Sequence, residues 1–310
     1  MMKKFSKKVL LFLLPVLVVW IIVELFYRTV ETNYTYKNEI VREYYDEGEV
    51  LIMGSSHSFY GINPEYFQYN TYNFANISQS LYFDELLLEK HLDNFDELKV
   101  VVLTIGYFTL SQEDDGLEDR WRKYFYDQQM ELDVPSVSAW DMKKYSLALT
   151  RRFDKSVDLM REYFSEGTVV TSYPNGYGIQ DSTHIVKDKE LVARNIAKKH
   201  EDGSSNFNAN RLRLNRIIER CAERNVKVLL VEMPVHKTYY NSLDTRKRRK
   251  ISTLLRVLAS ANENTTHVKL SRDNRFTEED LRDADHLTNE GARKCSSILN
   301  HIIWTELSGN

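Results

Sequence analysis

The sequence has few cysteines, which limits the sites and crosslinks that it can form. Among 310 residues there are two, Cys221 and Cys295, each within a predicted helix. They could pair only if those helices touch, and two buried thiols are the expected state. No spacing of cysteines or histidines is typical of a metal site. We therefore expect no metal and no other cofactor.

The sequence also lacks a large excess of charge of either sign. Its formal net charge is −3, so no general basic field would attract nucleic acid, which is not expected as a partner. The basic run Lys247–Lys250 is interpreted as the solvent-exposed face of a helix. Because 42% of the 310 residues are hydrophobic, the chain can bury a substantial core.

The N-terminus has a long hydrophobic run without a cleavage signal after it. Four lysines among the first eight residues precede an almost continuous apolar segment, Val9–Tyr27. Its roughly 19 residues span about 30 Å as a helix, the thickness of a bilayer core. No small-x-small site follows, so we expect an uncleaved single-pass membrane anchor rather than a signal peptide. The lysines should stay cytoplasmic, which places the chain after Arg28 outside, in the periplasm or the extracellular space.

The rest of the chain is predicted to contain a connector and one domain. Residues 1–28 form the anchor, 29–48 a polar, tyrosine-rich connector, and 49–310 the domain, with a mostly helical insertion at about 111–205. The aromatic residues of the insertion either stack on sugar rings or pack in a small core of the insertion itself.

Within residues 49–310, short apolar segments alternate with amphipathic helices. The predicted strands are 50–53, 71–74, 99–105, 226–232 and 268–270. This alternation predicts the α/β class, with a parallel sheet in a flavodoxin-like three-layer α/β/α sandwich. In such a sheet the C-terminal ends of all strands lie at one edge.

The first strand, Val50–Met53, ends in Gly54-Ser55-Ser56. Gly54 permits a sharp turn, and a serine just past a parallel strand lies where these sheets bind ligands. Ser55 or Ser56 is therefore a candidate nucleophile. The alternative is that Gly-Ser-Ser is only a turn.

A nucleophilic serine needs a base, and the base needs a carboxylate that fixes its tautomer. Asp283 and His286, three residues apart before the last helix, could supply both. Because both motifs follow strands of one parallel sheet, they can meet at its edge despite their distance in the sequence.

These two motifs together resemble the SGNH, or GDSL-type, hydrolase and acyltransferase superfamily, in which the serine opens the domain and Asp-x-x-His closes it. The family nucleophile is the third residue of its Gly-Asp-Ser block, which is Ser56 here, and Ser55 replaces the aspartate. Gly-Ser-Ser is similar to membrane-anchored members that acylate cell-surface polymers, among them the D-alanyl-transfer proteins of teichoic acid and the acetylating proteins of exopolysaccharide assembly.

The resemblance implies acyl transfer or ester hydrolysis on an extracytoplasmic glycan through an acyl-serine. It also implies a partner, a multi-span membrane O-acyltransferase. In the family's second block a glycine N–H binds the oxyanion, and Ser78 stands at that position. Ser78 could instead cap the helix that follows. Gly54, Asn76 and His57 are further candidates for oxyanion or substrate contacts, although His57 could equally be structural.

The sequence departs from the family after the third strand. The family usually has Gly-x-Asn there, with the asparagine as a second oxyanion donor, whereas this chain has Gly106-Tyr107-Phe108. Either another group supplies that hydrogen bond or the site is weaker, since one such donor contributes about 10²–10³ in rate. The alternative function is a non-catalytic binding or assembly module of a cell-surface polysaccharide system.

Overall fold

The computed structural model describes residues 2–112, 120–180, 186 and 188–308. The chain forms two compact units. The first combines Met1–Glu39 with Glu118–Thr171, and the second combines Ile40–Leu117 with Ser172–Asn310. These boundaries differ from the predicted ones, because much of the predicted connector and the middle of the predicted insertion fold together with the N-terminal helix.

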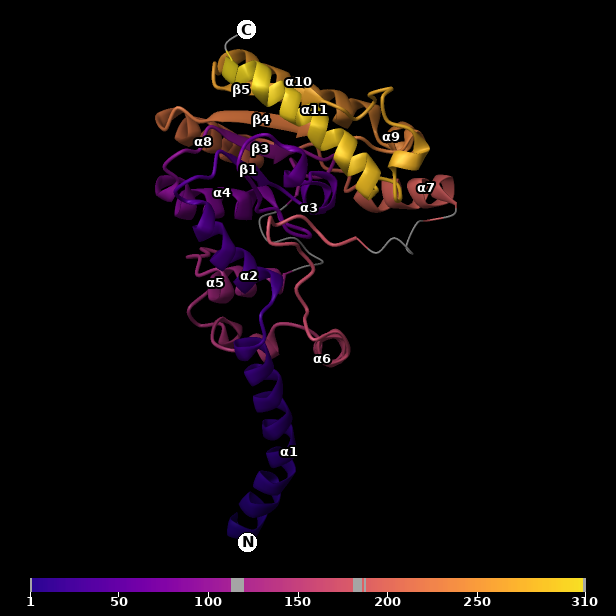
Figure 1. The fold of residues 1–310 in the computed structure, drawn as a ribbon. Helices are drawn as coiled ribbons and strands as arrows, with labels where there is room; N and C mark the ends of the chain where they lie inside the picture. The colour runs from indigo at the N-terminus through magenta and orange to yellow at the C-terminus, as the bar shows by residue number, and fades with distance from the viewer. Residues whose placement is uncertain (1, 113–119, 181–185, 187, 309–310) are drawn as a thin grey trace. The chain divides into compact units, whose positions relative to one another are not determined.

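The second unit contains a five-stranded parallel sheet with the order β2-β1-β3-β4-β5 (Figure 1). The strands are β1 (Val50–Met53), β2 (Thr71–Asn73), β3 (Val100–Thr104), β4 (Lys227–Glu232) and β5 (Thr265–Lys269). This is the flavodoxin-like order, and it confirms the predicted α/β class. The last strand begins before its predicted start at residue 268.

Helices cover both faces of the sheet, so the central strands are buried along their length. Alternate strand residues such as Ile52, Val102 and Leu229 pack with Cys295 and Leu299 of α11 (Asn289–Ser308). The helices α4 (Leu81–His91) and α8 (Asn208–Glu223) pack against each other and contribute nothing to that cluster. They cover the opposite face, toward which the intervening strand side chains point.

Further helices are described in the second unit. They are α3 (Ser56–Gly61), α7 (Lys189–His200), α9 (Lys237–Ser242), α10 (Thr245–Ala261), η1 (Val41–Tyr44), η2 (Pro64–Tyr66), η3 (Leu92–Asn94) and η7 (Glu278–Asp280). Cys221 on α8 and Cys295 on α11 are free and buried, as expected. Burial raises the pKa of the Cys221 thiol to about 12, which makes it unreactive at neutral pH.

The first unit is built on the N-terminal helix α1 (Met2–Thr29), which is long and apolar enough to cross a membrane. Its other elements are α2 (Asn33–Ile40), α5 (Arg122–Gln129), η4 (Met142–Lys144), η5 (Leu147–Leu149) and α6 (Phe153–Glu166). Tyr27 of α1 and Tyr34 of α2 pack their rings on Phe125, at centroid distances of 5.4 and 5.3 Å. The buried aromatic residues of α5 therefore share a core with the N-terminal segment, which the sequence analysis did not predict.

Candidate active site

Ser56 lies at the turn from β1 into α3. Gly54 adopts φ +117°, and a Cβ at this position would come within 2.5 Å of Thr104 Oγ1. The turn therefore requires glycine. Ser55 caps α3, its hydroxyl accepting the His57 N–H at 3.5 Å, and Ser56 is the first helical residue. The Ser56 side chain is partly exposed at the C-terminal edge of the sheet.

The predicted nucleophile, base and carboxylate meet. Ser56 Oγ is 2.9 Å from His286 Nε2, across 230 residues of sequence. His286 Nδ1 is 3.0 and 3.1 Å from the two carboxylate oxygens of Asp283, which also accepts the His286 backbone N–H at 2.9 Å. Because Nδ1 carries the proton that it donates to Asp283, Nε2 is free to accept the proton of Ser56.

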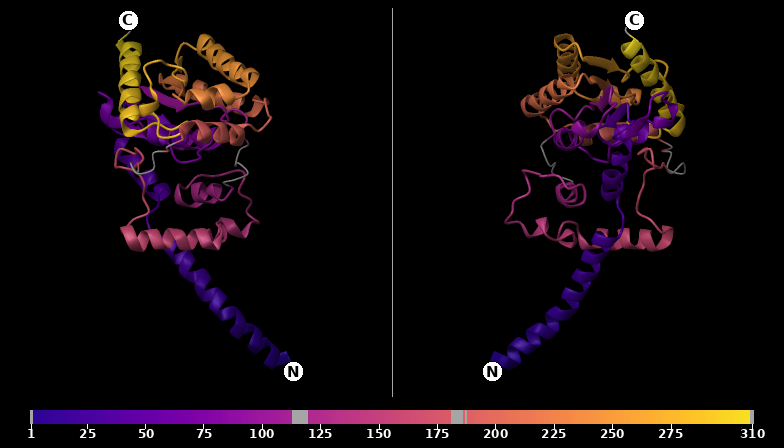
Figure 2. Two further views of the ribbon diagram at one scale, coloured as in Figure 1. Left: turned by 90° about the vertical axis from the view of Figure 1, so that its right-hand side faces the viewer. Right: turned by 60° about the vertical axis from the view of Figure 1, so that its left-hand side comes forward.

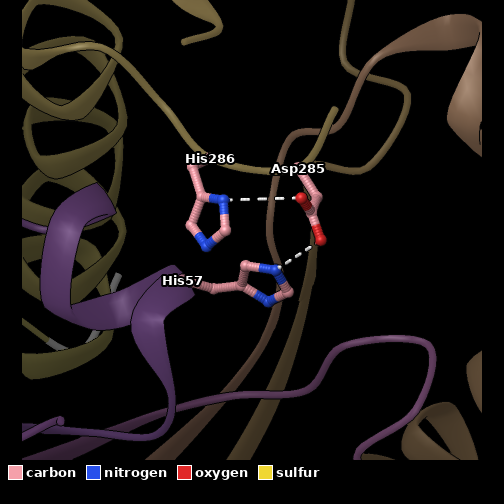
Figure 3. A group of neighbouring side chains, drawn as sticks. All are labelled: His57, Asp285 and His286. Atoms are coloured by element: carbon pink, nitrogen blue, oxygen red, sulfur yellow. Dashed lines mark hydrogen bonds and ion pairs between the residues drawn. The ribbon is translucent and has the colours of Figure 1, made fainter. Parts of the chain in front are cut away.

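A second carboxylate, Asp285, joins the histidines into a network (Figure 3). Its Oδ2 is 3.1 Å from His57 Nε2, and its Oδ1 is 3.4 Å from His286 Nδ1. His200 Nδ1 on α7 is 3.6 Å from the same carboxylate. His57, Asp285 and His286 are grouped closely enough to suggest metal ligands. However, each ring nitrogen that faces Asp285 is at hydrogen-bond or ion-pair distance, which accounts for the cluster without a metal.

Asp285 and His200 were missed by the sequence analysis. Asp285 is only 4% exposed. The sequence Asp283-Ala284-Asp285-His286 does not indicate which of its two carboxylates is buried. The available signal was the presence of two carboxylates within three residues of the candidate base. His57 was expected to be either structural or substrate-facing, and it contacts this buried carboxylate.

The network sets the charges of its members. Burial lowers the pKa of the His286 imidazole, but the Asp283 hydrogen bond and the nearby Asp285 charge outweigh burial and raise it above 6.5. Burial would raise the pKa of Asp285, yet the His57 hydrogen bond and the histidine charges hold it well below its usual value. His200 is different, because burial lowers its pKa to about 4 and keeps it neutral. His286 is therefore a base of increased strength.

The predicted oxyanion loop, residues 73–80, lies beside the Ser56 turn. The Asn76 backbone N–H donates to the Gly54 carbonyl at 3.2 Å. Ser78 has φ +57°, a left-handed conformation that favours glycine, as at the family position. The N-cap of α4 is Ser80, so the alternative that Ser78 caps this helix is wrong. Asn76 Nδ2 is buried and has no hydrogen-bond partner among the described residues.

Asp84 of α4 is hydrogen-bonded both to the turn before Ser56 and to the loop that contains Ser78. Its Oδ1 accepts the Gly54 N–H at 2.9 Å and the Gln79 amide at 2.7 Å. Burial raises the pKa of Asp84 to about 7, although the two hydrogen bonds oppose this shift. A carboxyl that is mostly neutral below pH 7 thus holds the turn that carries the nucleophile.

The end of β3 lies next to His57 and lacks the family asparagine. The Gly106 N–H donates to Thr109 Oγ1 at 2.9 Å, and the Phe108 ring is 5.7 Å from the His57 ring. A hollow of about 490 Å³, including space open to solvent, is lined by His57, Gly106 and Tyr239 among others. Ser56 is not among the residues that line this hollow. The hollow therefore lies beside the candidate active site and does not contain the Ser56 side chain.

Part of the predicted insertion also adjoins α3. The Gly178 N–H donates to the Phe59 carbonyl at 2.8 Å, and the Gln180 amide donates to the Tyr60 carbonyl at 2.7 Å. The Tyr60 ring in turn lies 6.2 Å from the His286 ring. Residues 172–180 therefore brace the short helix that begins at the nucleophile.

Comparisons with known proteins show weak similarity. No family model matches the chain, and no curated protein matches it. One similar solved structure is a candidate platelet activating factor from Streptococcus pneumonia, at 14% identity and a TM-score of 0.42, covering 96% of this chain and 99% of that one. Another is a GDSL-like lipase from Bacteroides thetaiotaomicron, at 12% identity and a TM-score of 0.42, covering 88% and 98%. These values are too low to add to what the strand order and the site geometry show.

The raised pKa of Asp84 predicts a pH-dependent stability. A folded-state pKa near 7 against an ordinary 3.8 means that the folded protein binds more protons between these values. Stability should therefore fall as pH rises from about 4 to 7, by on the order of a few kcal/mol. Asp84→Asn keeps an oxygen for both donors and cannot ionise. Urea unfolding should show the variant more stable than wild type at pH 7.5, with the difference largely lost at pH 4.5.

The exposed Asp96 provides a matched control for this experiment. Asp96→Asn makes the same chemical change at an exposed position and shows what the loss of a carboxylate without burial does to the free energy of unfolding. A constant stability difference between Asp84→Asn and wild type at both pH values would show that the charge of Asp84 is not responsible.

The position of Asp285 predicts a change in the titration of His286. Asp285→Asn removes a negative charge that favours the imidazolium, so the pKa of His286 should fall. Histidine-selective NMR of the ring signals should show its midpoint at lower pH in the variant, with exposed His301 as the internal control. An unchanged midpoint in a variant with wild-type circular dichroism would mean that Asp283 alone sets the basicity of His286.

Proposed function

We propose that this protein is a serine-dependent enzyme of the SGNH or GDSL type, which transfers or hydrolyses acyl groups through an acyl-serine. One observation carries the proposal: the Ser56–His286–Asp283 chain has hydrogen-bond distances of 2.9 and 3.0 Å. A serine whose proton can pass to an oriented imidazole is an activated nucleophile. The partial exposure of Ser56 leaves it accessible to a substrate.

The first half of the reaction forms the acyl-enzyme. Ser56 Oγ attacks the carbonyl carbon of an ester while His286 Nε2 takes its proton. Asp283 holds the imidazole in the required tautomer and stabilises its charge. His286 then returns the proton to the departing alcohol oxygen, and the acyl group remains on Ser56. Asp285 acts through the histidines as a positioning residue.

The negative oxygen formed in this step needs hydrogen-bond donors. We assign this role to the backbone N–H groups of Ser56 and Ser78, in the first turn of α3 and in the adjacent loop. The Asn76 amide is a suitable further donor, because a buried N–H without an acceptor is unfavourable until one arrives. It would then substitute for the asparagine missing after β3. Substrate contacts by Gly54 and His57 stay predictions.

The second half of the reaction determines the biological role. Water as acceptor gives a carbohydrate esterase, and a sugar hydroxyl gives an O-acyltransferase. The apolar helix α1 supports a single-pass anchor with the N-terminus in the cytoplasm and the catalytic unit outside. We propose a cell-surface polysaccharide or another acylated glycan as the substrate. A multi-span membrane O-acyltransferase is the proposed partner that delivers the acyl group.

A second candidate is a non-catalytic binding or assembly module of the same polysaccharide system. The end of β3 favours it, because Gly106-Tyr107-Phe108 offers no side-chain amide to an oxyanion. The complete hydrogen-bonded chain to Ser56 favours the enzyme.

A fluorophosphonate probe distinguishes these two candidates. The Ser56 oxygen should displace fluoride from phosphorus, so the wild-type chain becomes labelled at Ser56, as identified by mass spectrometry. Ser56→Ala should abolish labelling. Ser55→Ala removes the neighbouring hydroxyl, which caps α3 at a contribution of about 1 kcal/mol, and should retain labelling. A folded wild-type protein that does not react would favour the binding module.

The ester content of the surface glycan tests the substrate. A strain producing Ser56→Ala should show fewer O-acyl groups than wild type if the enzyme adds them, and more if it removes them. The ester groups can be quantified by NMR of the purified polysaccharide. The two strains could have equal O-acyl content although the wild-type protein labels at Ser56. That result would exclude the polysaccharide as a substrate and leave the serine chemistry intact.

A further inference from the structure

The outer end of α1 is tied to the loop that contains η4 and η5. Trp20 Nε1 donates to Ser146 Oγ at 3.0 Å. The Glu24 carboxylate accepts the Ser146 hydroxyl at 2.8 Å and the Ala148 N–H at 3.0 Å, and it pairs with Arg28 at 2.6 Å. Glu24, which is unusual in an apolar segment, is therefore fully paired. Trp20 and Arg28 are about 12 Å apart along a helix, so this loop follows the last two turns of α1.

Helix α6 is fixed at the same end of α1. The Tyr27 and Ser156 hydroxyls are 3.0 Å apart, and the Phe26 and Tyr163 rings meet at 5.8 Å. Figure 2 shows α6 lying across the end of α1. Ser156 and Tyr163 are seven residues apart, two turns along one face of α6, so this face is the one held against α1.

An adjacent face of α6 is apolar, with exposed residues at its two ends and half-buried Val157 and Met160 between them. Phe153, Val157, Met160 and Phe164 recur at intervals of four, three and four residues, which aligns them along the helix. Phe153 is 59% and Phe164 78% exposed. The loop tied to α1 adds Trp140 and Met142, at 95% and 71% exposure. Charged residues occupy the remaining side of α6.

Such a group of large apolar side chains is unfavourable in water, and its position indicates what covers it. It lies in the same compact unit as α1 and is fixed to the last turns of a helix whose side chains from Phe5 to Leu25 are largely exposed. Phenylalanine on an amphipathic helix and tryptophan in an adjoining loop, at the end of a membrane span, are typical of the lipid–water interface.

We propose that residues 140–164, the interfacial segment, lie in the outer headgroup layer of the bilayer that α1 spans, with Trp140, Met142, Phe153 and Phe164 inserted among the lipids. The first unit is then a membrane-binding unit of two parts: a helix across the bilayer and a helix along its surface. This inference depends on α1 spanning the membrane and does not depend on the chemistry of Ser56.

Spin labels on two neighbouring residues of α6 test the proposal. Phe164→Cys and Ser165→Cys are each made in the full chain, labelled with a nitroxide and placed in lipid nanodiscs. Successive residues point about 100° apart on a helix, so Ser165 on the polar side is the matched control. Cys221 and Cys295 are buried, and the unsubstituted chain gives their background labelling.

Collisions of each label with oxygen, which concentrates in lipid, and with a water-soluble nickel chelate are measured by EPR. The label at 164 should collide mainly with oxygen and the label at 165 mainly with the chelate, a severalfold difference in their ratio. Equal access of both labels to the chelate would place the segment in water. A label at 164 shielded from both reagents would mean that protein covers it, through a second copy or a partner. Either result would overturn the proposal.

Discussion

The hydrogen bond between Ser56 and His286 depends on the parallel order of the sheet. All five strands end at the same edge, so the loop after β1 and the segment after β5 meet although 230 residues separate them. The spatial order β2-β1-β3 also makes the position after β1 the switch point, where adjacent connections leave in opposite directions. Strand topology thus places the candidate nucleophile before any side-chain detail determines its reactivity.

Reactivity is then a matter of buried charge. Asp285 is nearly inaccessible to water, and a buried carboxylate is unfavourable unless charges and hydrogen bonds compensate it. His57 and His286 supply that compensation on two sides. In the proposed reaction, the same carboxylate would also stabilise the imidazolium that His286 becomes on taking the Ser56 proton. The hydrogen bonds and charges that stabilise the buried Asp285 carboxylate therefore also raise the basicity of His286.

The sheet and the meeting of Ser56, Asp283 and His286 were predictable from sequence because their signals are local. The run Val100–Thr104 is apolar and β-branched, and Asp283-x-x-His286 is a compact motif. Asp285, by contrast, differs from Asp283 only in burial, which depends on contacts with His57 and α7. The first unit was missed for a similar reason: its core joins Tyr27 and Tyr34 to Phe125, about 90 residues away, without any periodic pattern.

The departures from the family pattern follow the demands that each position makes. Position 55 must cap α3, and serine and aspartate are both good N-caps. Since Ser55 is 7% exposed, serine does this without burying a charge. Position 78 adopts φ +57°, which costs a serine a strain of about 1–2 kcal/mol, and in the proposed mechanism it presents its backbone N–H. The position after β3 is different, because the family asparagine donates from its side-chain amide. A backbone N–H at the same position cannot take over that hydrogen bond. In the proposed mechanism, compensation would come from another element, and the Asn76 amide is suited to provide it, because it is buried without a hydrogen-bond partner among the described residues and lies in the loop bonded to Gly54.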